Sequence, residues 1–289
     1  MSAPPRPRLA DLGPGITAGV SFGFSDVLGK IVFADGAAPL TVSGVRGVIG
    51  VAMLLAWLRV GRPPRPHDRA QRLVSIGLGV LYAANIYGVL KAIQLVPVPI
   101  AILSYFVYPL LTGIAGAALG IERLRPRDVA VAVVAFAGLA LMIGAAPGGI
   151  APLGVLVAIG AALCRVVMLL VTRTRLAGAD PRVTSWYSLI ASTIVLLALA
   201  TVSDTWGFPR HALAWWAFLG VAVASTISTI GLFASTARIG AFRTALVMNL
   251  EPVVSTLLSI AVLGELLTPV QVGGAATMIA ALVAFQLWR

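Results

Sequence analysis

The chain has 289 residues, of which 59% are hydrophobic and 11% charged, and its mean hydropathy is +1.00. Soluble domains are typically about 45–50% apolar and about 25% charged, so this composition excludes an ordinary soluble protein. The net charge of +11 does not indicate nucleic acid as a partner, because the basic residues lie in short clusters between apolar runs, as in loops that flank membrane spans. We therefore expect an all-α integral membrane protein whose surroundings are the lipid bilayer.

Proline, glycine and clusters of charge divide the sequence into ten apolar segments, each about long enough to cross a bilayer as a helix. In chain order, the expected spans lie near residues 13–34, 39–60, 70–92, 97–120, 127–145, 151–174, 182–203, 211–236, 240–264 and 268–288.

The basic residues predict which way the chain crosses the membrane. With the N-terminus inside, the inner segments carry 16 Lys and Arg residues, whereas the outer side carries only Lys30, Lys91 and Arg210. Arg46 and Arg165 fall within spans. Because inner loops are enriched in Lys and Arg, both termini are expected in the cytoplasm.

Two segments of the sequence follow one pattern. YPLLTGIAGAALGIERLRP begins at Tyr108, and EPVVSTLLSIAVLGELLTP begins at Glu251. Three pairs of residues match at a constant offset of 143, namely Pro109 with Pro252, Glu122 with Glu265, and Pro126 with Pro269. The match predicts two five-helix halves, residues 1–147 and 148–289.

An odd number of spans in each half predicts that the second half is inverted relative to the first. The charges agree, since the first copy continues as ERLRPRD with three arginines and the second as ELLTPVQ with none. Inverted repeats are a recurring plan of secondary transporters, which bind substrate near the membrane midplane between the repeats. We therefore expect ten helices around a central cavity, opened to either side in turn by alternating access.

These features resemble the drug/metabolite transporter superfamily of EamA type. The resemblance rests on the ten spans, the doubled Pro…Glu motif, the arginine in SGVRGVIGVAMLLAWL and the Glu-Pro pair of the ninth span. It implies an exporter, not an enzyme, whose cavity is lined mainly by spans 1, 3, 4, 6, 8 and 9. Phe22, Phe24, Cys164 and Arg165 occupy regions of spans 1 and 6 where many members carry tryptophan.

The tyrosines of spans 3 and 4 are similar to those of bacterial aromatic amino acid exporters of the YddG kind. This similarity implies export of aromatic and other neutral amino acids across a bacterial inner membrane. Tyr105 and Tyr108 share a helix face, as do Tyr82 and Asn85, so their rings and polar groups are suited to a flat amphipathic substrate. The other residues expected at the cavity are Phe22, Phe24, Cys164, Arg165, Met168, Ser225, Ser228, Thr229, Met248, Asn249 and Glu251.

Charges and prolines inside the spans have two interpretations each. Glu251 and Arg165 lie at similar depths and either form a structural ion pair or contact the charged groups of an amino acid. Asp26 and Arg46 form a second candidate pair. Pro109 and Pro252 are expected to kink their helices, either as a symmetric hinge or gate or simply to shape the bundle.

Other protein classes find little support in the sequence. GVSFG at residues 19–23 matches the nucleophile elbow of hydrolases, but it has no histidine near it and no strand–turn–helix context. The sequence contains no metal-binding motif and no phosphate-binding loop, so no cofactor or metal is expected. The remaining alternatives are a flippase-type carrier of lipid headgroups, an exporter of cationic drugs and a channel; no obligate protein partner is evident.

Overall fold

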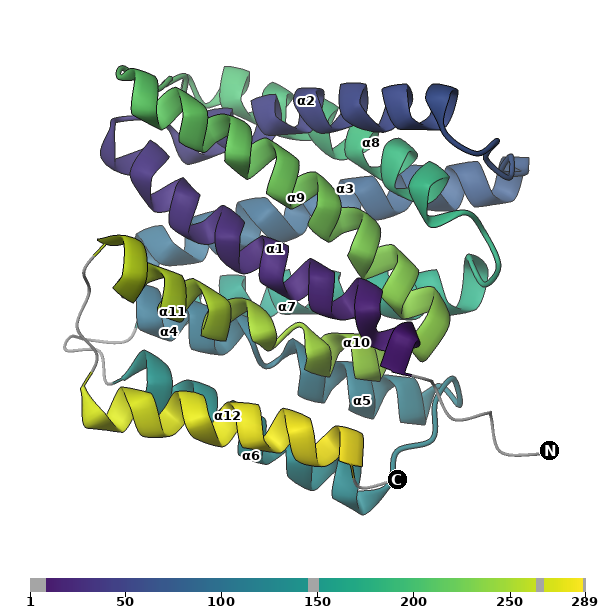
Figure 1. Ribbon diagram of the computed structural model, residues 1–289, viewed down its shortest axis with the longest axis vertical. Helices are drawn as coiled ribbons and strands as arrows, with labels where there is room; N and C mark the ends of the chain where they lie inside the picture. Colours follow the sequence, from purple (N-terminus) through teal and green to yellow (C-terminus); the bar gives the residue numbers. More distant parts are fainter. Residues whose placement is uncertain (1–8, 145–150, 264–267, 288–289) are drawn as a thin grey trace.

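The computed structural model describes residues 9–144, 151–263 and 268–287 (Figure 1). Glu265 of the repeat motif lies outside these ranges, as do Arg6, Arg8 and Arg289 of the charge count. Within the described ranges all regular secondary structure is helical, which confirms the expected fold class. The helices are α1 (Leu9–Ala34), α2 (Pro39–Val60), α3 (Arg69–Leu95), α4 (Val98–Tyr105), α5 (Tyr108–Ala118), α6 (Pro126–Ile143), α7 (Pro152–Arg175), α8 (Pro181–Val202), α9 (Ala212–Ile239), α10 (Ala241–Val247), α11 (Leu250–Leu263) and α12 (Pro269–Leu287).

These helices form a multi-pass membrane protein. In the part of the chain that the structure describes, nine segments are long and apolar enough to cross a bilayer, and Pro269–Phe285 forms a shorter apolar helix. Two of the nine segments, Ile100–Ala118 and Ala241–Val262, each contain two consecutive helices. The expected spans therefore agree with the structure to within a few residues.

Spans four and nine are irregular beside Pro109 and Pro252, the positions at which the sequence predicts kinks. A turn at residues 106–107 separates α4 from α5, and a turn at residues 248–249 separates α10 from α11. Pro109 and Pro252 lie two or three residues beyond these turns. Each proline lacks the N–H that would bond the carbonyl four residues earlier, and its ring clashes with that carbonyl, which ends the preceding helix.

The two halves of the chain pack against each other helix by helix. The first and third spans of one half lie against the third and first of the other, as α1 on α9 and α3 on α7. The second spans pair as α2 on α8, and the fifth spans as α6 on α12, which lie side by side in Figure 1. The pattern is unchanged when the halves are exchanged, as expected of a two-fold arrangement.

Glycines allow some helices to approach each other closely. A Cβ atom added at Gly23 of α1 would lie 2.9 Å from the carbonyl oxygen of Glu251 in α11. One added at Gly274 of α12 would lie 2.6 Å from the carbonyl oxygen of Gly138 in α6. Small residues at such crossings let backbones touch, as is common between membrane helices.

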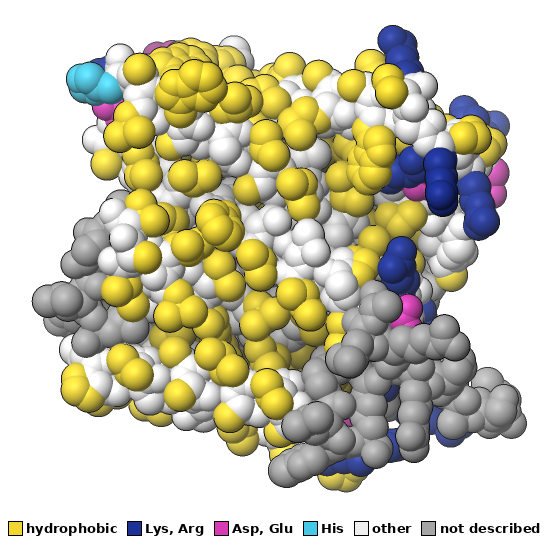
Figure 2. Space-filling model, in the orientation of Figure 1, with side chains coloured by type: hydrophobic (Ala, Val, Ile, Leu, Met, Phe, Trp, Pro, Cys, Tyr) yellow, Lys and Arg dark blue, Asp and Glu magenta, His cyan; other side chains and the backbone are white. Residues whose placement is uncertain are grey.

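Basic side chains gather at one end of the helices. Figure 2 shows Lys and Arg concentrated beside the ends of α2, α3 and α8, while hydrophobic side chains cover most of the visible face. The apolar face suits contact with lipid, and the basic end suits the headgroup region.

Candidate functional site

The two interrupted spans place polar and aromatic residues beside the broken backbone. Tyr105 ends α4 and Tyr108 begins α5, and their ring centroids are 5.4 Å apart. In the other half, Asn249 lies in the turn between α10 and α11, and Glu251 follows in the first turn of α11. Irregular backbone is tolerated at membrane depth only where it is enclosed by protein or water, so both breaks belong inside the bundle.

Arg165 of α7 lies at the centre of the aromatic residues. Its side chain is only 3% exposed. Its guanidinium carbon lies 5.6 Å from the centroid of the Phe22 ring and 5.8 Å from that of the Tyr108 ring. The structure therefore brings together Phe22, Tyr105, Tyr108 and Arg165 from spans 1, 4 and 6, as expected of a common site.

The guanidinium of Arg165 is poorly compensated. In the described chain it forms no ion pair, so the expected pair with Glu251 is absent, as is that between Asp26 and Arg46. Arg165 Nε and the Tyr108 hydroxyl are buried and have no hydrogen-bond partner among the described residues. Cation–π contacts contribute about 0.5–2 kcal/mol each, less than the several kcal/mol that burying a charge costs. Arg165 is therefore a buried cation held among aromatic rings, with no ion pair to a described residue.

Glu251 supplies negative charge to the same region. Its side chain is half-buried, and its charge acts on Arg165 and on Arg46 of α2. Asp26 of α1 is exposed and lies within electrostatic range of Glu251 and Arg46. Acidic and basic groups are thus near one another without direct pairing.

A small polar cavity lies between α2, α3, α8 and α9. Its volume is about 10 Å³, roughly room for one water molecule. Three expected residues line it, Tyr82, Ser225 and Thr229, together with Arg46. The hydroxyls of Ser225 and Thr229 donate to carbonyls of their own helix, at 3.2 and 2.8 Å, so they offer only acceptor lone pairs to the cavity.

The remaining expected residues divide between packing and the outer surface. Asn85 is buried, and its amide donates to the carbonyl of Ala161 at 2.8 Å, which joins α3 to α7. Phe24 does not join the central cluster; it is 46% exposed and lines an outward-facing apolar groove between α1 and α9 of about 410 Å³. Met168 belongs to the same buried cluster as Tyr82, and Met248 to the same one as Tyr105. Asn249 and Ser228 are buried, and Cys164 is half-buried.

Sequence reasoning missed part of the polar cavity and a contact at the end of the bundle. Ser192 and Thr226 line the polar cavity, but single hydroxyls in apolar spans carry little signal. Glu122 was recognised only as a landmark of the repeat, yet its carboxylate accepts from the backbone N–H groups of Ala241 and Phe242 at the start of α10. No cluster of His, Cys, Asp or Glu in the described ranges has the size of a metal site.

Comparisons with known proteins agree with this architecture. The EamA-like transporter family model matches the chain twice, over residues 14–144 and 152–285. Among solved structures, one crystal structure superimposes with a TM-score of 0.83 over 98% of this chain and 98% of its own, at 22% sequence identity. No curated protein matches the sequence significantly.

The structural likeness, at this identity, supports the fold alone. The family match covers most of the chain, and each matched range contains one of the two interrupted spans. Members of the family are transporters and not enzymes. In the described ranges, nine membrane-crossing segments and one shorter apolar helix form the bundle. Because the family model matches the chain twice and its members carry small molecules across membranes, this chain is a small-molecule transporter and belongs to the EamA-like transporter family.

Proposed function

We propose that this protein exports small amphipathic metabolites, above all aromatic and other neutral amino acids, from the cytoplasm across a bacterial inner membrane by alternating access. The observation that carries the proposal is the buried guanidinium of Arg165, which lies against two aromatic rings and has no acidic partner in the described chain.

The amino acid carboxylate binds Arg165. Carboxylates match the planar fork of a guanidinium, and such charge-assisted hydrogen bonds are stronger than neutral ones. The Tyr108 hydroxyl, which is buried without a hydrogen-bond partner in the described part of the chain, adds a donor to the same group.

The remaining parts of the substrate meet complementary groups. An aromatic side chain packs against Tyr105 and Phe22, at the favourable offset or edge-to-face geometry of ring pairs. The ammonium group faces Glu251, whose carboxylate balances it within the electrostatic range of Arg165. A substrate that carries both charges satisfies both groups at once, which a cationic drug does not.

Transport follows from the two-fold packing. In the present conformation the binding residues are enclosed, since Tyr105, Tyr108 and Arg165 are all buried. The two halves are inverted, and rocking one against the other around the breaks in spans four and nine exposes the site to each side in turn. Both termini lie in the cytoplasm, in keeping with the basic end of the helices (Figure 2).

The purified protein in liposomes tests this assignment. Vesicles that contain the protein and are loaded with labelled phenylalanine, tyrosine, tryptophan, leucine or alanine should lose label faster than vesicles loaded in the same way without the protein. Competition by 3-phenylpropionate, which keeps the carboxylate, is expected to exceed competition by phenethylamine, which keeps only the amine. Absence of flux across the whole panel would contradict the proposal, and flux of cationic dyes alone would favour the cationic-drug alternative.

Two pairs of variants isolate the residues. Arg165→Gln removes a buried charge contact and should weaken amino acid binding on the order of a hundredfold, whereas Arg165→Lys should retain part of it. Phe22→Leu is expected to weaken transport, and Phe24→Leu, the same change on the opposite face of α1, is not. Equal activity of Arg165→Gln and the natural protein would contradict the proposed binding of the substrate carboxylate by Arg165.

A further inference from the structure

The connection between α2 and α3 carries an excess of positive charge. Its sequence from residue 59 is RVGRPPRPHDRAQR, with five arginines and one aspartate. All five arginines are exposed, and they are Arg59, Arg62, Arg65, Arg69 and Arg72. We call residues 59–72 the basic loop.

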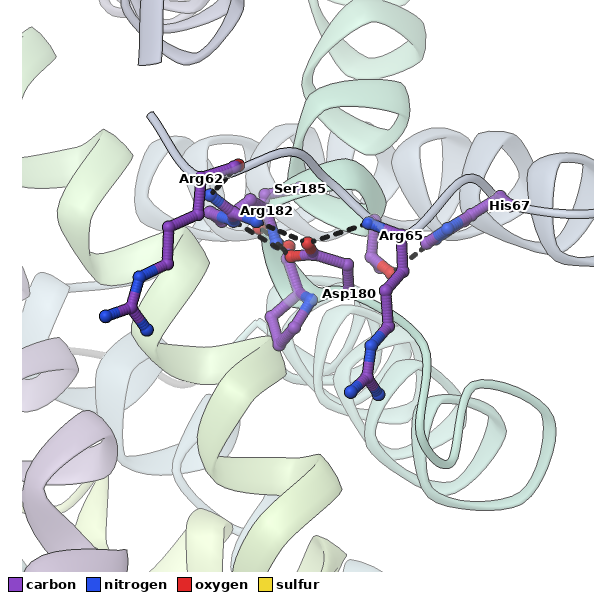
Figure 3. Close-up of polar contacts among 8 residues, drawn as sticks. Arg62, Arg65, His67, Asp180, Arg182 and Ser185 are labelled. Atoms are coloured by element: carbon purple, nitrogen blue, oxygen red, sulfur yellow. Dashed lines mark hydrogen bonds and ion pairs between the residues drawn. The ribbon is translucent and has the colours of Figure 1, made fainter. Parts of the chain in front are cut away.

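The basic loop is fixed to the start of α8. The carboxylate of Asp180 accepts a hydrogen bond from the Arg182 guanidinium at 2.7 Å and a longer one from the backbone N–H of Arg65 at 3.4 Å. The same guanidinium donates to the carbonyl of Arg62 at 3.2 Å. Figure 3 shows the guanidinium groups of Arg62 and Arg65 pointing away from Asp180. The backbone is thus held while these two charges remain available.

A second anchor lies further along the loop. The ring Nε2 of His67 is 2.9 Å from the Thr184 hydroxyl, and Arg72 Nε donates to the carbonyl of His67 at 2.9 Å. Burial lowers the pKa of His67, so this anchor is neutral near pH 7. Three prolines in the segment RPPRP further restrict the backbone. The arginines therefore lose little conformational freedom of the main chain when they bind a ligand.

The acidic groups near the loop are already engaged. Burial raises the pKa of Asp180, but hydrogen bonds from Arg182 outweigh this effect and lower it, so the carboxylate is ionised and paired. Asp68 caps α3 by accepting from the backbone N–H of Gln71 at 2.7 Å. The side chains of four arginines, by contrast, have no hydrogen bond or ion pair with the described residues, namely Arg59, Arg62, Arg65 and Arg69. Their charge is free to meet an external anion.

Apolar side chains adjoin this charge on the helix surfaces. Val60 at the end of α2 is 88% exposed, and Leu73 at the start of α3 is 61% exposed. Trp57, one turn before Val60, lies with its ring centroid 5.5 Å from the Arg182 guanidinium carbon. Large apolar groups on the span and guanidinium groups at its end complement the two parts of a phospholipid, which are its acyl chains and its phosphate.

We propose that the basic loop, with the start of α8, is a binding site for the headgroups of anionic phospholipids. Clusters of four to eight basic residues at the end of a membrane helix attract anionic lipid, with a contribution of about 1 kcal/mol per residue. The phosphate groups lie against Arg62, Arg65 and Arg69, and the acyl chains run along Val60 and Leu73. Bound lipid fixes α2, α3 and α8 to one leaflet while other helices move.

Native mass spectrometry of the full-length protein in non-ionic detergent tests the site. The protein is mixed with equal amounts of phosphatidylglycerol and phosphatidylcholine of matched chains, and the lipid retained after activation is counted. The natural protein should retain phosphatidylglycerol preferentially. In the triple variant Arg62→Gln/Arg65→Gln/Arg69→Gln, that preference should fall on the order of a hundredfold, given about fivefold per arginine.

The matched control is Arg123→Gln/Arg125→Gln/Arg127→Gln, which removes the same charge from the connection before α6 and from the first turn of α6. If this control keeps its preference for phosphatidylglycerol, the result supports a site at the basic loop. If both triple variants lose the preference equally, the proposed site is contradicted and the attraction is unspecific. Displacement of the lipid by excess inorganic phosphate would identify a free-anion site instead. If the triple variant unfolds, single Arg62→Gln and Arg65→Gln variants, each expected to lose about fivefold, decide the question.

Discussion

The carboxylate of Glu122 accepts hydrogen bonds from the backbone N–H of Ala241 at 2.6 Å and from that of Phe242 at 2.9 Å. A residue of the first half of the chain thus caps the broken ninth span of the second half. Arg173 lies 4.0 Å from the same carboxylate and donates to the carbonyl of Ala237 at 3.0 Å. Gly240 precedes α10 with φ +95°, and a Cβ there would collide with Glu122. This arrangement joins three helices at one end of the bundle.

Removal of the Glu122 cap should loosen that end. Glu122→Ala leaves two backbone donors without their acceptor, and loss of a helix cap costs about 0.5–2 kcal/mol. Glu122→Gln keeps one acceptor oxygen but loses the charge, so its effect should be smaller. Thermal unfolding in detergent is expected to rank the natural protein above Glu122→Gln and Glu122→Ala lowest. An unfolding temperature of Glu122→Ala equal to that of the natural protein would contradict the role of the cap.

The α6–α12 crossing should tolerate no side chain at Gly274. A Cβ there would lie 2.6 Å from the carbonyl oxygen of Gly138 and 2.8 Å from the carbonyl carbon of Leu141, so Gly274→Ala must push the helices apart. Overpacking of this kind costs typically about 1–3 kcal/mol. Gly273→Ala is the control, because a Cβ at Gly273 would meet nothing within 4 Å. Chemical or thermal unfolding measures the stability of both variants. Equal stability of Gly274→Ala and Gly273→Ala would contradict a close contact between α6 and α12 at Gly274.

The connection between α1 and α2 should lose stability in acid. Asp35 accepts hydrogen bonds from the His211 ring and from the backbone N–H groups of His211 and Arg210, which lowers its pKa from 3.8 to about 2. A depressed pKa in the folded state gives stability that is present above 3.8 and lost as the pH falls towards 2. Asp35→Asn should therefore flatten the pH dependence of unfolding in this window. Asp204→Asn, whose carboxylate bonds nothing in the described chain, should leave it unchanged.

Neutralising Glu251 should impair transport without unfolding the protein. Glu251→Gln keeps the shape of a half-buried side chain but removes the negative charge near Arg165. Loss of a charge contact to the substrate ammonium is expected to lower the rate at limiting substrate about tenfold or more. Efflux from liposomes across a range of pH measures it. Unchanged rates at every pH would assign Glu251 a purely structural role.

The helices were predictable from the sequence because a bilayer imposes simple rules. Ten apolar segments, a charge asymmetry and prolines at constant spacing suffice to predict the spans and their helical type, since every backbone group in lipid must be bonded within a helix. The doubled Pro109 and Pro252 correctly located the irregular positions. Whether they bent or broke the helices depended on the neighbouring packing.

The assembly of the site depended on the tertiary structure. Depth along a span placed Arg165 near Glu251, but only the rotation of each helix decided that Arg165 faces Phe22 and Tyr108 and forms no ion pair. The same rotation directs Phe24 to the outer surface, two residues from Phe22.

Sequence alone therefore determined the membrane class, the spans and the repeat, because hydrophobicity and backbone hydrogen bonding are local properties. The tertiary structure decided which faces meet, that Glu122 caps α10, and that the basic loop is anchored by Asp180. These contacts join residues more than a hundred positions apart, and their free energy depends on the packing of whole helices.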